Sequence, residues 1–443
     1  MIYRIISYII FLVNYPTKFY NFFNTSEITT GRKRHKITKM KKAVMYGAGS
    51  IGRGFIGQLF YMSGYETTFI DINIDLVNRL NVDGSYPIYI TRGDRYQEYR
   101  VKNVRGVDGR DVSAVAEAVA EADIAATAVG VTVLRFIAAP FAEGVKLRCA
   151  RGIDAPLNVI ICENLMGADE YFAGLVKAHL NDEQKEYFDK YIGLVEPSIG
   201  RMVPLTPKEL AEQNPLAVCV EEYCELPVDK KGFKGEIPHV VNMVPYTPFD
   251  YYIQRKLFLH NMSHAMTAYL GALKGYTYIW EATLDPEIQL LVLRALLEAA
   301  RALHIEHGVP LDEIYLHIED LLFRFENKLL GDTIERVGRD TKRKLSENDR
   351  LVGAAKLCYK HGIMPLHICL GIAAGYMFAP ETDESSREVA GFVQNNGLNA
   401  ALAQYSSIVD AGCDLALVIK RAYNLLDKYD KSFVPIIAEL QKR

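Results

Sequence analysis

The sequence predicts an α/β protein in which a parallel β-sheet comes first and a region built of helices follows. Between residues 43 and 162, short apolar runs alternate with helix-like segments, which is the pattern of a parallel sheet covered by helices. Beyond about residue 245 the apolar residues recur at helical spacing. The chain has 443 residues, enough for two domains with separate cores.

The first 39 residues belong to neither region. Residues 4–13 form an apolar run, and the basic run Arg32-Lys33-Arg34-His35-Lys36 follows. The apolar run is too short to span a bilayer, and no small-residue cleavage pattern follows it closely. We expect residues 1–39 to be a disordered extension or the product of a mis-assigned start, with translation beginning at Met40.

The first apolar run of the α/β region leads into a GxGxxG pattern that is followed by a helix-like segment. Gly47 permits a tight turn, Gly49 lets the backbone approach a pyrophosphate, and Gly52 lets helix and strand pack closely. The amide groups of Ser50 and Ile51, at the start of the helix, supply donors for phosphate oxygens.

The next apolar run, residues 66–70, ends at Asp71, about 20 residues after the glycines. A carboxylate at this place accepts hydrogen bonds from the adenosine ribose hydroxyls. It also repels a 2′-phosphate, so the expected cofactor is NAD. Together these features predict a Rossmann-type dinucleotide-binding domain over residues 40–245. Two placements are open for Arg53, which follows the last glycine: contact with the pyrophosphate or a solvated helix position.

Two further strands, at residues 123–128 and 158–162, are each followed by residues suited to binding. In parallel sheets, ligands lie at the carboxyl ends of the strands. We therefore expect Thr127 and Gly130 to bind the cofactor, and Asn164 to lie where cofactor and substrate meet. For Asn164, a turn-forming role is the alternative.

One helix of the second region is marked at both ends. Asp285-Pro286-Glu287 supplies an N-cap and a proline at the first helical position, and His307-Gly308 ends the leucine-rich segment that follows. Further helix-like stretches occupy residues 311–327, 366–379 and 408–427. We predict an all-helical substrate domain over residues 246–443.

Three polar residues cluster near the start of this domain. Lys256, Asn261 and His264 fall within an arc of about 140° on an α-helix, so one helix can direct an amine, an amide and an imidazole at one site. A lysine buried beside a cationic nicotinamide ring has a lowered pKa and can take a hydroxyl proton. An asparagine amide can stabilise the developing alkoxide, and a histidine can bind neighbouring hydroxyls or orient the lysine. An ordinary polar helix face is the alternative.

The composition argues against several classes of partner. The formal net charge is −3, so no charge excess attracts nucleic acid or a membrane surface. The seven cysteines are scattered without zinc-ribbon or CxxC spacing, which indicates a reduced, cytoplasmic chain. His304 and His307 flank Glu306, but this is not the HExxH spacing of a zinc site. We expect no metal and a small-molecule substrate.

The spacing Lys256-x4-Asn261-x2-His264 resembles the signature of the polyol-specific long-chain dehydrogenases. Other stretches that match this family occur in the expected order. They are residues 46–57, 127–130, 162–164, 233–235, 255–258, 324–327, 336–339, 343–345 and 348–350.

The resemblance implies an NAD-dependent, metal-independent hydride transfer in which Lys256 is the general base. It also implies that Asn164 and Asn261 hold the reacting oxygen and that His264 lies on the substrate side. The reaction implied is the interconversion of mannitol 1-phosphate and fructose 6-phosphate.

A run of basic residues favours a phosphorylated substrate. Arg336 and Lys344 match family positions that contact the polyol, and Arg339, Lys342 and Arg343 lie between them. Phosphate recognition uses arginine for bidentate bonds and lysine as a point charge. We therefore expect Arg336, Arg339, Arg343 and Lys344 to contact the substrate. A solvated charged loop is the alternative.

The chain departs from the family pattern at three places. Gly200 stands where the family usually has an aspartate, Met262-Ser263 precedes His264 where Thr-Gly is common, and residues 340–342 lack an expected proline. These departures surround the expected substrate pocket, so they bear on the sugar more than on the chemistry.

Three other functions stay open. A sister enzyme would act on an unphosphorylated polyol or a uronate-derived acid. A catalytically inactive NAD-binding sensor would not need the Lys-Asn-His set, which is intact. A sugar-acid phosphate dehydrogenase also pairs a Rossmann domain with helices, but this signature is not its usual one. The sequence leaves the oligomeric state open, a monomer included.

Overall fold

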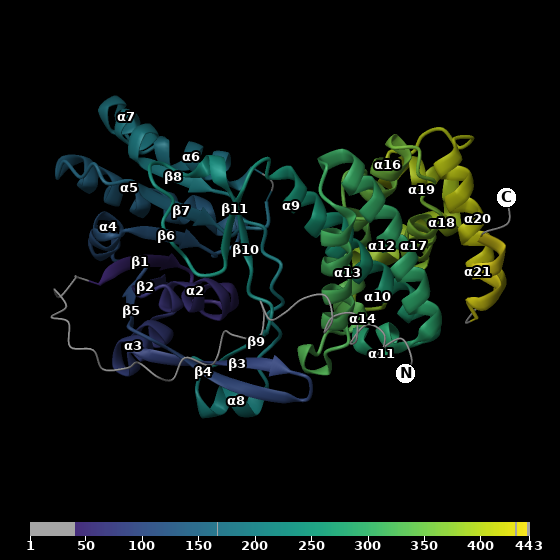
Figure 1. Ribbon diagram of the computed structural model, residues 1–443, viewed down its shortest axis with the longest axis horizontal. Helices are drawn as coiled ribbons and strands as arrows, with labels where there is room; N and C mark the ends of the chain where they lie inside the picture. The colour runs from purple at the N-terminus through teal and green to yellow at the C-terminus, as the bar shows by residue number, and fades with distance from the viewer. Residues whose placement is uncertain (1–39, 166, 430–431, 441–443) are drawn as a thin grey trace. The chain divides into compact units, whose positions relative to one another are not determined.

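The computed structural model describes residues 40–165, 167–429 and 432–440 (Figure 1). The expected extension of residues 1–39 lies outside these ranges. Within them, a parallel sheet comes first along the chain, and from residue 250 onward the elements are helices. This confirms the predicted fold class.

The first region is built around a six-stranded parallel sheet with the order β5-β2-β1-β6-β7-β8. Its strands are β1 (Lys41–Tyr46), β2 (Tyr65–Asp71), β5 (Val104–Asp108), β6 (Ile124–Thr127), β7 (Leu157–Ile161) and β8 (Ile192–Val195). The order reverses at β1, because β2 lies on one side of it and β6 on the other. Ligands of such sheets bind at this switch point, beyond the carboxyl ends of the strands.

The side chains of β1 alternate between two cores. Ala43 and Met45 join the core that holds the helix after the glycine turn, whereas Val44 and Tyr46 join the core on the opposite face. Both faces are therefore covered, as a parallel sheet requires. The helices are a π-helical turn (Gly52–Ile56) that continues as α2 (Gly57–Met62), α3 (Ile74–Asp83), α4 (Val112–Glu121), α5 (Leu134–Ala150), α6 (Ala168–Lys177), α7 (Asp182–Tyr191) and α8 (Lys208–Gln213).

Two smaller sheets were not predicted from the sequence. One joins β3 (Ser85–Arg92), β4 (Arg95–Lys102) and β9 (Val218–Glu221), and the other pairs β10 (Leu226–Asp229) with β11 (Met243–Tyr246). In the first, β9 pairs with β3, which lies more than a hundred residues earlier in the chain, so the pairing leaves no local signature.

The helical region shares one hydrophobic core. Its elements are α9 (Asp250–Arg255), a π-helix (Lys256–Asn261), α10 (Met262–Lys274), α11 (Ile279–Leu284), α12 (Pro286–His307), α13 (Leu311–Phe325), α14 (Ile334–Gly338), α15 (Thr341–Lys344), α16 (Val352–Lys360), α17 (Leu366–Met377), α18 (Glu384–Asn396), α19 (Leu398–Ser406), α20 (Asp414–Tyr429) and α21 (Val434–Leu440).

The end signals of α12 are confirmed. The Asp285 side chain accepts hydrogen bonds from the backbone of Glu287 and Ile288, and Gly308 ends the helix with a φ of 69°. The predicted start of the last long helix, residue 408, is wrong, because α20 begins at Asp414. A turn precedes it, in which the Gly412 amide donates to Asp410 Oδ1 over 2.8 Å.

A buried ion pair ties α13 to β9. The Arg324 guanidinium donates to both carboxylate oxygens of Glu221, over 2.7 and 2.6 Å, and its Nη2 also donates to the Gly200 carbonyl. The Arg324 side chain is 7% exposed and that of Glu221 is 2% exposed. Removing one partner of such a pair leaves an uncompensated charge in the core.

We predict that Arg324→Met lowers the free energy of unfolding by about 3–5 kcal/mol, because the Glu221 carboxylate loses its cation while it stays buried. Urea denaturation followed by circular dichroism measures the loss. The control is Lys360→Met, which breaks the more exposed pair with Glu306 and should cost under about 1 kcal/mol. Equal losses for the two variants would show that the buried pair stabilises the protein no more than the exposed pair does.

Candidate functional site

The glycine turn after β1 fits a dinucleotide pyrophosphate. Gly47 has a φ of 90°, and a Cβ there would lie 2.5 Å from the Ala128 carbonyl oxygen, while a Cβ at Gly52 would overlap the Gly47 carbonyl. The protein's own packing therefore requires these two glycines. A Cβ at Gly49 would meet open space within 4 Å. No protein atom accounts for that glycine, whereas a closely approaching phosphate would.

Asp71 ends β2 beside this turn. Its Oδ2 accepts a hydrogen bond from the Ala48 amide over 2.8 Å, and its Oδ1 accepts one from the Asn73 amide over 2.9 Å. A carboxylate has about four acceptor positions, so capacity remains for ribose hydroxyls. The solvated placement of Arg53 is wrong. Its side chain is buried, and it donates to the carbonyls of Ala48 and Leu216.

A carboxylate organises the ends of β6 and β7. Thr127 is completely buried, and its hydroxyl donates to Glu163 Oε2 over 2.5 Å. Glu163 Oε1 accepts the Val129 amide over 2.8 Å. The Thr127 side chain therefore supports the loop through Glu163 and is itself covered. Gly130 follows in this loop with a φ of 93° and open space around it, and Asn164 is exposed directly after Glu163.

The segment from Lys256 to Asn261 is a π-helix, so the expectation of one regular α-helix is corrected. Hydrogen bonds of a π-helix join residues five apart, which places Lys256 nearly above Asn261. In an α-helix they would be about 140° apart around the axis. At the change back to α10, the buried Ser263 hydroxyl donates to the Leu259 carbonyl over 2.6 Å. The serine that departs from the family pattern thus satisfies a carbonyl at this junction.

Lys256 lies in an environment that favours its neutral form. Burial, and then the charge of Arg350, lowers the pKa of the Lys256 amine to about 8, while the Cys162 thiol acts in the opposite direction. Cys162 directly follows β7 and precedes Glu163 and Asn164. The amine is therefore within electrostatic range of the strand end at which Asn164 is exposed.

His264 is held neutral. Burial, followed by the charges of Arg336, Lys344 and Arg350, lowers the pKa of His264 to about 3. Its ring stacks on Phe325, with centroids 4.6 Å apart. Its Nε2 lies 3.4 Å from Asp332 Oδ2 and has no hydrogen-bond partner within the described ranges. The ring borders a pocket that is lined by Met202, His264, Ile279, Trp280, Phe325, Asn327, Leu330 and Asp332.

The basic run does not form one patch. Arg336 is paired with Asp332, Lys342 with Glu388, and Arg343 with Asp340 and Asp349. Arg339 is exposed.

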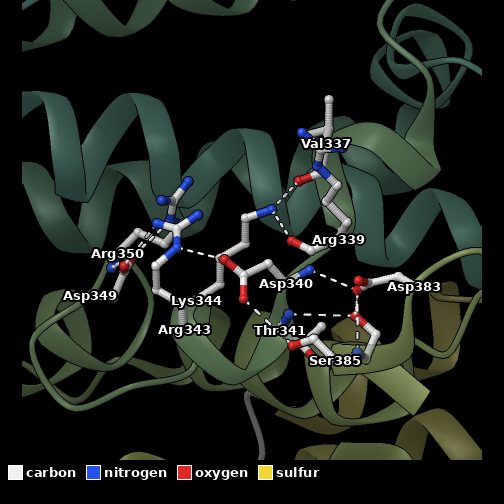
Figure 2. Close-up of polar contacts among 11 residues, drawn as sticks. Val337, Arg339, Asp340, Thr341, Arg343, Lys344, Asp349, Arg350, Asp383 and Ser385 are labelled. Carbon is white, nitrogen blue, oxygen red and sulfur yellow. Dashed lines mark hydrogen bonds and ion pairs between the residues drawn. The ribbon is translucent and has the colours of Figure 1, made fainter. Parts of the chain in front are cut away.

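Lys344 is buried, and its Nζ donates to the carbonyls of Val337, over 2.5 Å, and Arg339 (Figure 2). Burial, then the charges of Arg350 and Arg343, lowers the Lys344 pKa to about 7.

Sequence reasoning missed Arg350 and Asp332. The charge of Arg350 contributes to the lowered pKa of Lys256, His264 and Lys344, so Arg350 lies within electrostatic range of all three. Its only signal in the sequence was its place in the matching stretch at residues 348–350. Asp332 had no signal, because it faces His264 through a fold contact across 68 residues of chain.

Comparison with known proteins places the chain in a family. Residues 41–241 match the mannitol dehydrogenase Rossmann domain, and residues 249–437 match the mannitol dehydrogenase C-terminal domain. The chain belongs to the mannitol dehydrogenase family and is an oxidoreductase, which confirms the resemblance drawn from its motifs.

Individual relatives agree with this assignment. The chain is 36% identical over 392 residues to mannitol-1-phosphate 5-dehydrogenase of Thermoanaerobacter pseudethanolicus, covering 88% of this chain and 100% of that protein. Mannitol 2-dehydrogenase of Pseudomonas fluorescens, solved with NAD and D-mannitol, has a similar fold, with a TM-score of 0.67 at 18% identity over 91% of this chain and 95% of that one. A substrate-free D-sorbitol dehydrogenase gives 0.73 at 13% identity, with coverages of 88% and 93%.

Two further properties of the described residues concern metal binding and membrane spanning. No group of three or more His, Cys, Asp or Glu side chains in this part of the chain is arranged to hold a metal ion. Among the helices of the same residues, none is long and apolar enough to cross a membrane.

We predict that Asp71→Asn reduces the preference for NADH over NADPH by roughly tenfold, about 1.4 kcal/mol, because the charge that repels a 2′-phosphate is lost while an acceptor for Ala48 remains. Fluorescence titration with both cofactors measures the two dissociation constants. The control is Asp123→Asn, whose carboxylate accepts the Lys42 amide at the other end of the sheet and should leave both constants unchanged. An unaltered preference in Asp71→Asn would show that this residue does not contact the ribose.

Proposed function

We propose that this enzyme interconverts mannitol 1-phosphate and fructose 6-phosphate without a metal, with Lys256 as the general base. The cofactor is NAD. The observation that carries the proposal is the π-helix, which sets a lysine of lowered pKa above Asn261, within electrostatic range of the strand end that exposes Asn164.

Each polar residue has a role in this reaction. Neutral Lys256 takes the proton of the hydroxyl group that is oxidised. The amides of Asn261 and Asn164 donate to the reacting oxygen as negative charge develops on it. His264, kept neutral by burial, holds a neighbouring hydroxyl of the substrate. When bound, NAD supplies the acceptor for the hydride of the carbinol carbon. The amine and the amides together stabilise the charge that a metal stabilises in other alcohol dehydrogenases.

The 36% identity to a mannitol-1-phosphate 5-dehydrogenase supports the phosphorylated substrate. A second function, oxidation of an unphosphorylated polyol, is favoured by the pairing of Arg336, Lys342 and Arg343 with carboxylates. Those three cations are already neutralised, so they offer less attraction to a phosphate.

The test is NADH-coupled reduction of fructose 6-phosphate and of fructose, each with and without a chelator. We expect kcat/KM to be at least about a hundredfold higher for the phosphate, since charged hydrogen bonds each contribute about 1.5–3 kcal/mol, and we expect the chelator to have no effect. Equal rates for the two sugars would support the second function, and loss of activity with the chelator would contradict a lysine base without metal.

The lowered pKa of Lys256 sets an expected pH dependence. Oxidation needs the neutral amine, so its kcat/KM should rise with pH and level off above about 8. Reduction needs the ammonium form and should fall as pH rises through the same value. An ordinary lysine would place both changes near about 10.4. Initial rates in both directions between pH 6 and pH 10 measure the profile.

Lys256→Ala provides the matching control. Turnover should fall by at least about a hundredfold, because a positioned base contributes 10²–10⁴-fold, while NADH binding is unchanged. Lys360→Met, on the surface of α16, should behave as the wild type. A pH profile that keeps its shape in Lys256→Ala would assign the titration to another group.

A further inference from the structure

The cations near His264 are mostly neutralised by the protein itself. Arg336 is paired with Asp332, and Arg343 with Asp340 and Asp349. Lys344 donates to two backbone carbonyls. A phosphate in this region therefore needs donor nitrogens that are still free, which Arg339 offers at an exposed position and Arg350 at a part-buried one.

Arg350 provides such a group. Its side chain is 12% exposed, and its Nε donates to Asp349 Oδ1 over 2.7 Å. The Arg350 amide donates to the same oxygen, so Asp349 fixes the start of the side chain. The two terminal nitrogens, Nη1 and Nη2, have no hydrogen-bond partner within residues 40–165, 167–429 and 432–440. They hold four N–H donors in one plane, the shape that binds two oxygens of a phosphate.

The fold brings Arg350 to the site by close packing. Gly353, three residues on, packs against the π-helix so tightly that a Cβ there would lie 2.9 Å from Phe258 Cε1. Its amide donates to the Asp349 carbonyl over 2.8 Å, which closes the turn that carries Arg350. The turn therefore rests on the helix that carries Lys256.

Arg350 also lies near the segment that carries Lys344. In Figure 2, Arg350 and Asp349 lie on the opposite side of Lys344 from Val337 and Arg339. The charge of Arg350 contributes to the lowered pKa of Lys256, of His264 and of Lys344. Arg350 is therefore within electrostatic range of the base and of His264.

We infer that Arg350 binds the phosphate group of the substrate and determines the preference for a phosphorylated sugar. The inference rests on the proposed function and names the residue that recognises the phosphate. Arginine suits this role better than lysine, because the planar guanidinium forms two parallel bonds to one phosphate. The carboxylate of Asp349 holds the guanidinium in place while its terminal nitrogens remain available.

The test compares the full-length wild type with Arg350→Met, Arg350→Lys and Lys356→Met, using NADH with fructose 6-phosphate and with fructose. Arg350→Met should lower kcat/KM for fructose 6-phosphate roughly 10- to 100-fold more than it lowers kcat/KM for fructose, the loss expected for one charged contact, because the change in the Lys256 pKa acts on both sugars alike. The kcat/KM of Arg350→Lys for fructose 6-phosphate should lie between those of the wild type and Arg350→Met, because one point charge remains. Lys356, paired with Glu347 on the surface of α16, is the matched control and should behave as the wild type.

The outcomes separate the inference from the proposed function. If the wild type prefers fructose 6-phosphate and Arg350→Met keeps that preference, the inference is overturned and the proposed function stands. If Arg350→Met loses activity on both sugars equally while it still binds NADH, the residue has a general structural role and the inference is again overturned. If the wild type reduces the two sugars equally well, both the inference and the proposed function are overturned. If Arg350→Met fails to bind NADH, Arg350→Lys decides, since an unchanged ratio between the sugars contradicts the inference and a reduced ratio supports it.

Discussion

The π-helix between α9 and α10 is the constraint on which the site depends. A regular α-helix would separate Lys256 and Asn261 by about 140°, which places the amine and the amide at the two edges of one face. The wider turn of the π-helix reduces that separation. Such turns disturb the hydrogen bonding of a helix and occur mostly as single turns at functional sites. Here the Ser263 hydroxyl bonds the Leu259 carbonyl where the α-helix resumes, and the buried residues of α10 anchor the segment in the core.

Burial lowers the pKa values of the basic residues of the site. Lys256, His264 and Lys344 all have lowered pKa values, and in each the largest cause is removal from water. The protein limits the repulsion among its cations with carboxylates, Asp332 beside Arg336 and Asp349 beside Arg350. The result is a site with an amine of lowered pKa, a neutral imidazole and, in Arg350, a part-buried guanidinium whose terminal nitrogens have no hydrogen-bond partner among the described residues. This combination suits a proton acceptor next to an anionic substrate.

Much of the fold could be predicted because its signals are local. Gly52 is required by a contact with Gly47 in the same turn, and the cap of α12 lies within four residues. The π-helix could not be predicted, because a change in hydrogen-bond register leaves the apolar pattern almost unchanged. The Arg324–Glu221 pair joins segments 103 residues apart. The basic run was interpreted as a phosphate site because the local partners of Arg336 and Arg343 were not weighed and because Glu388, the partner of Lys342, lies 46 residues further along the chain.

The central claim is that Lys256 and Asn261 act on one substrate oxygen. The most direct measurement is a crystal structure of the enzyme with NADH and fructose 6-phosphate. The account predicts that Lys256 Nζ and the Asn261 amide nitrogen both lie within about 3.2 Å of the carbonyl oxygen that is reduced, with the π-helix intact. A complex in which that oxygen is bound by other groups, or in which Asn261 points away from it, would contradict the account.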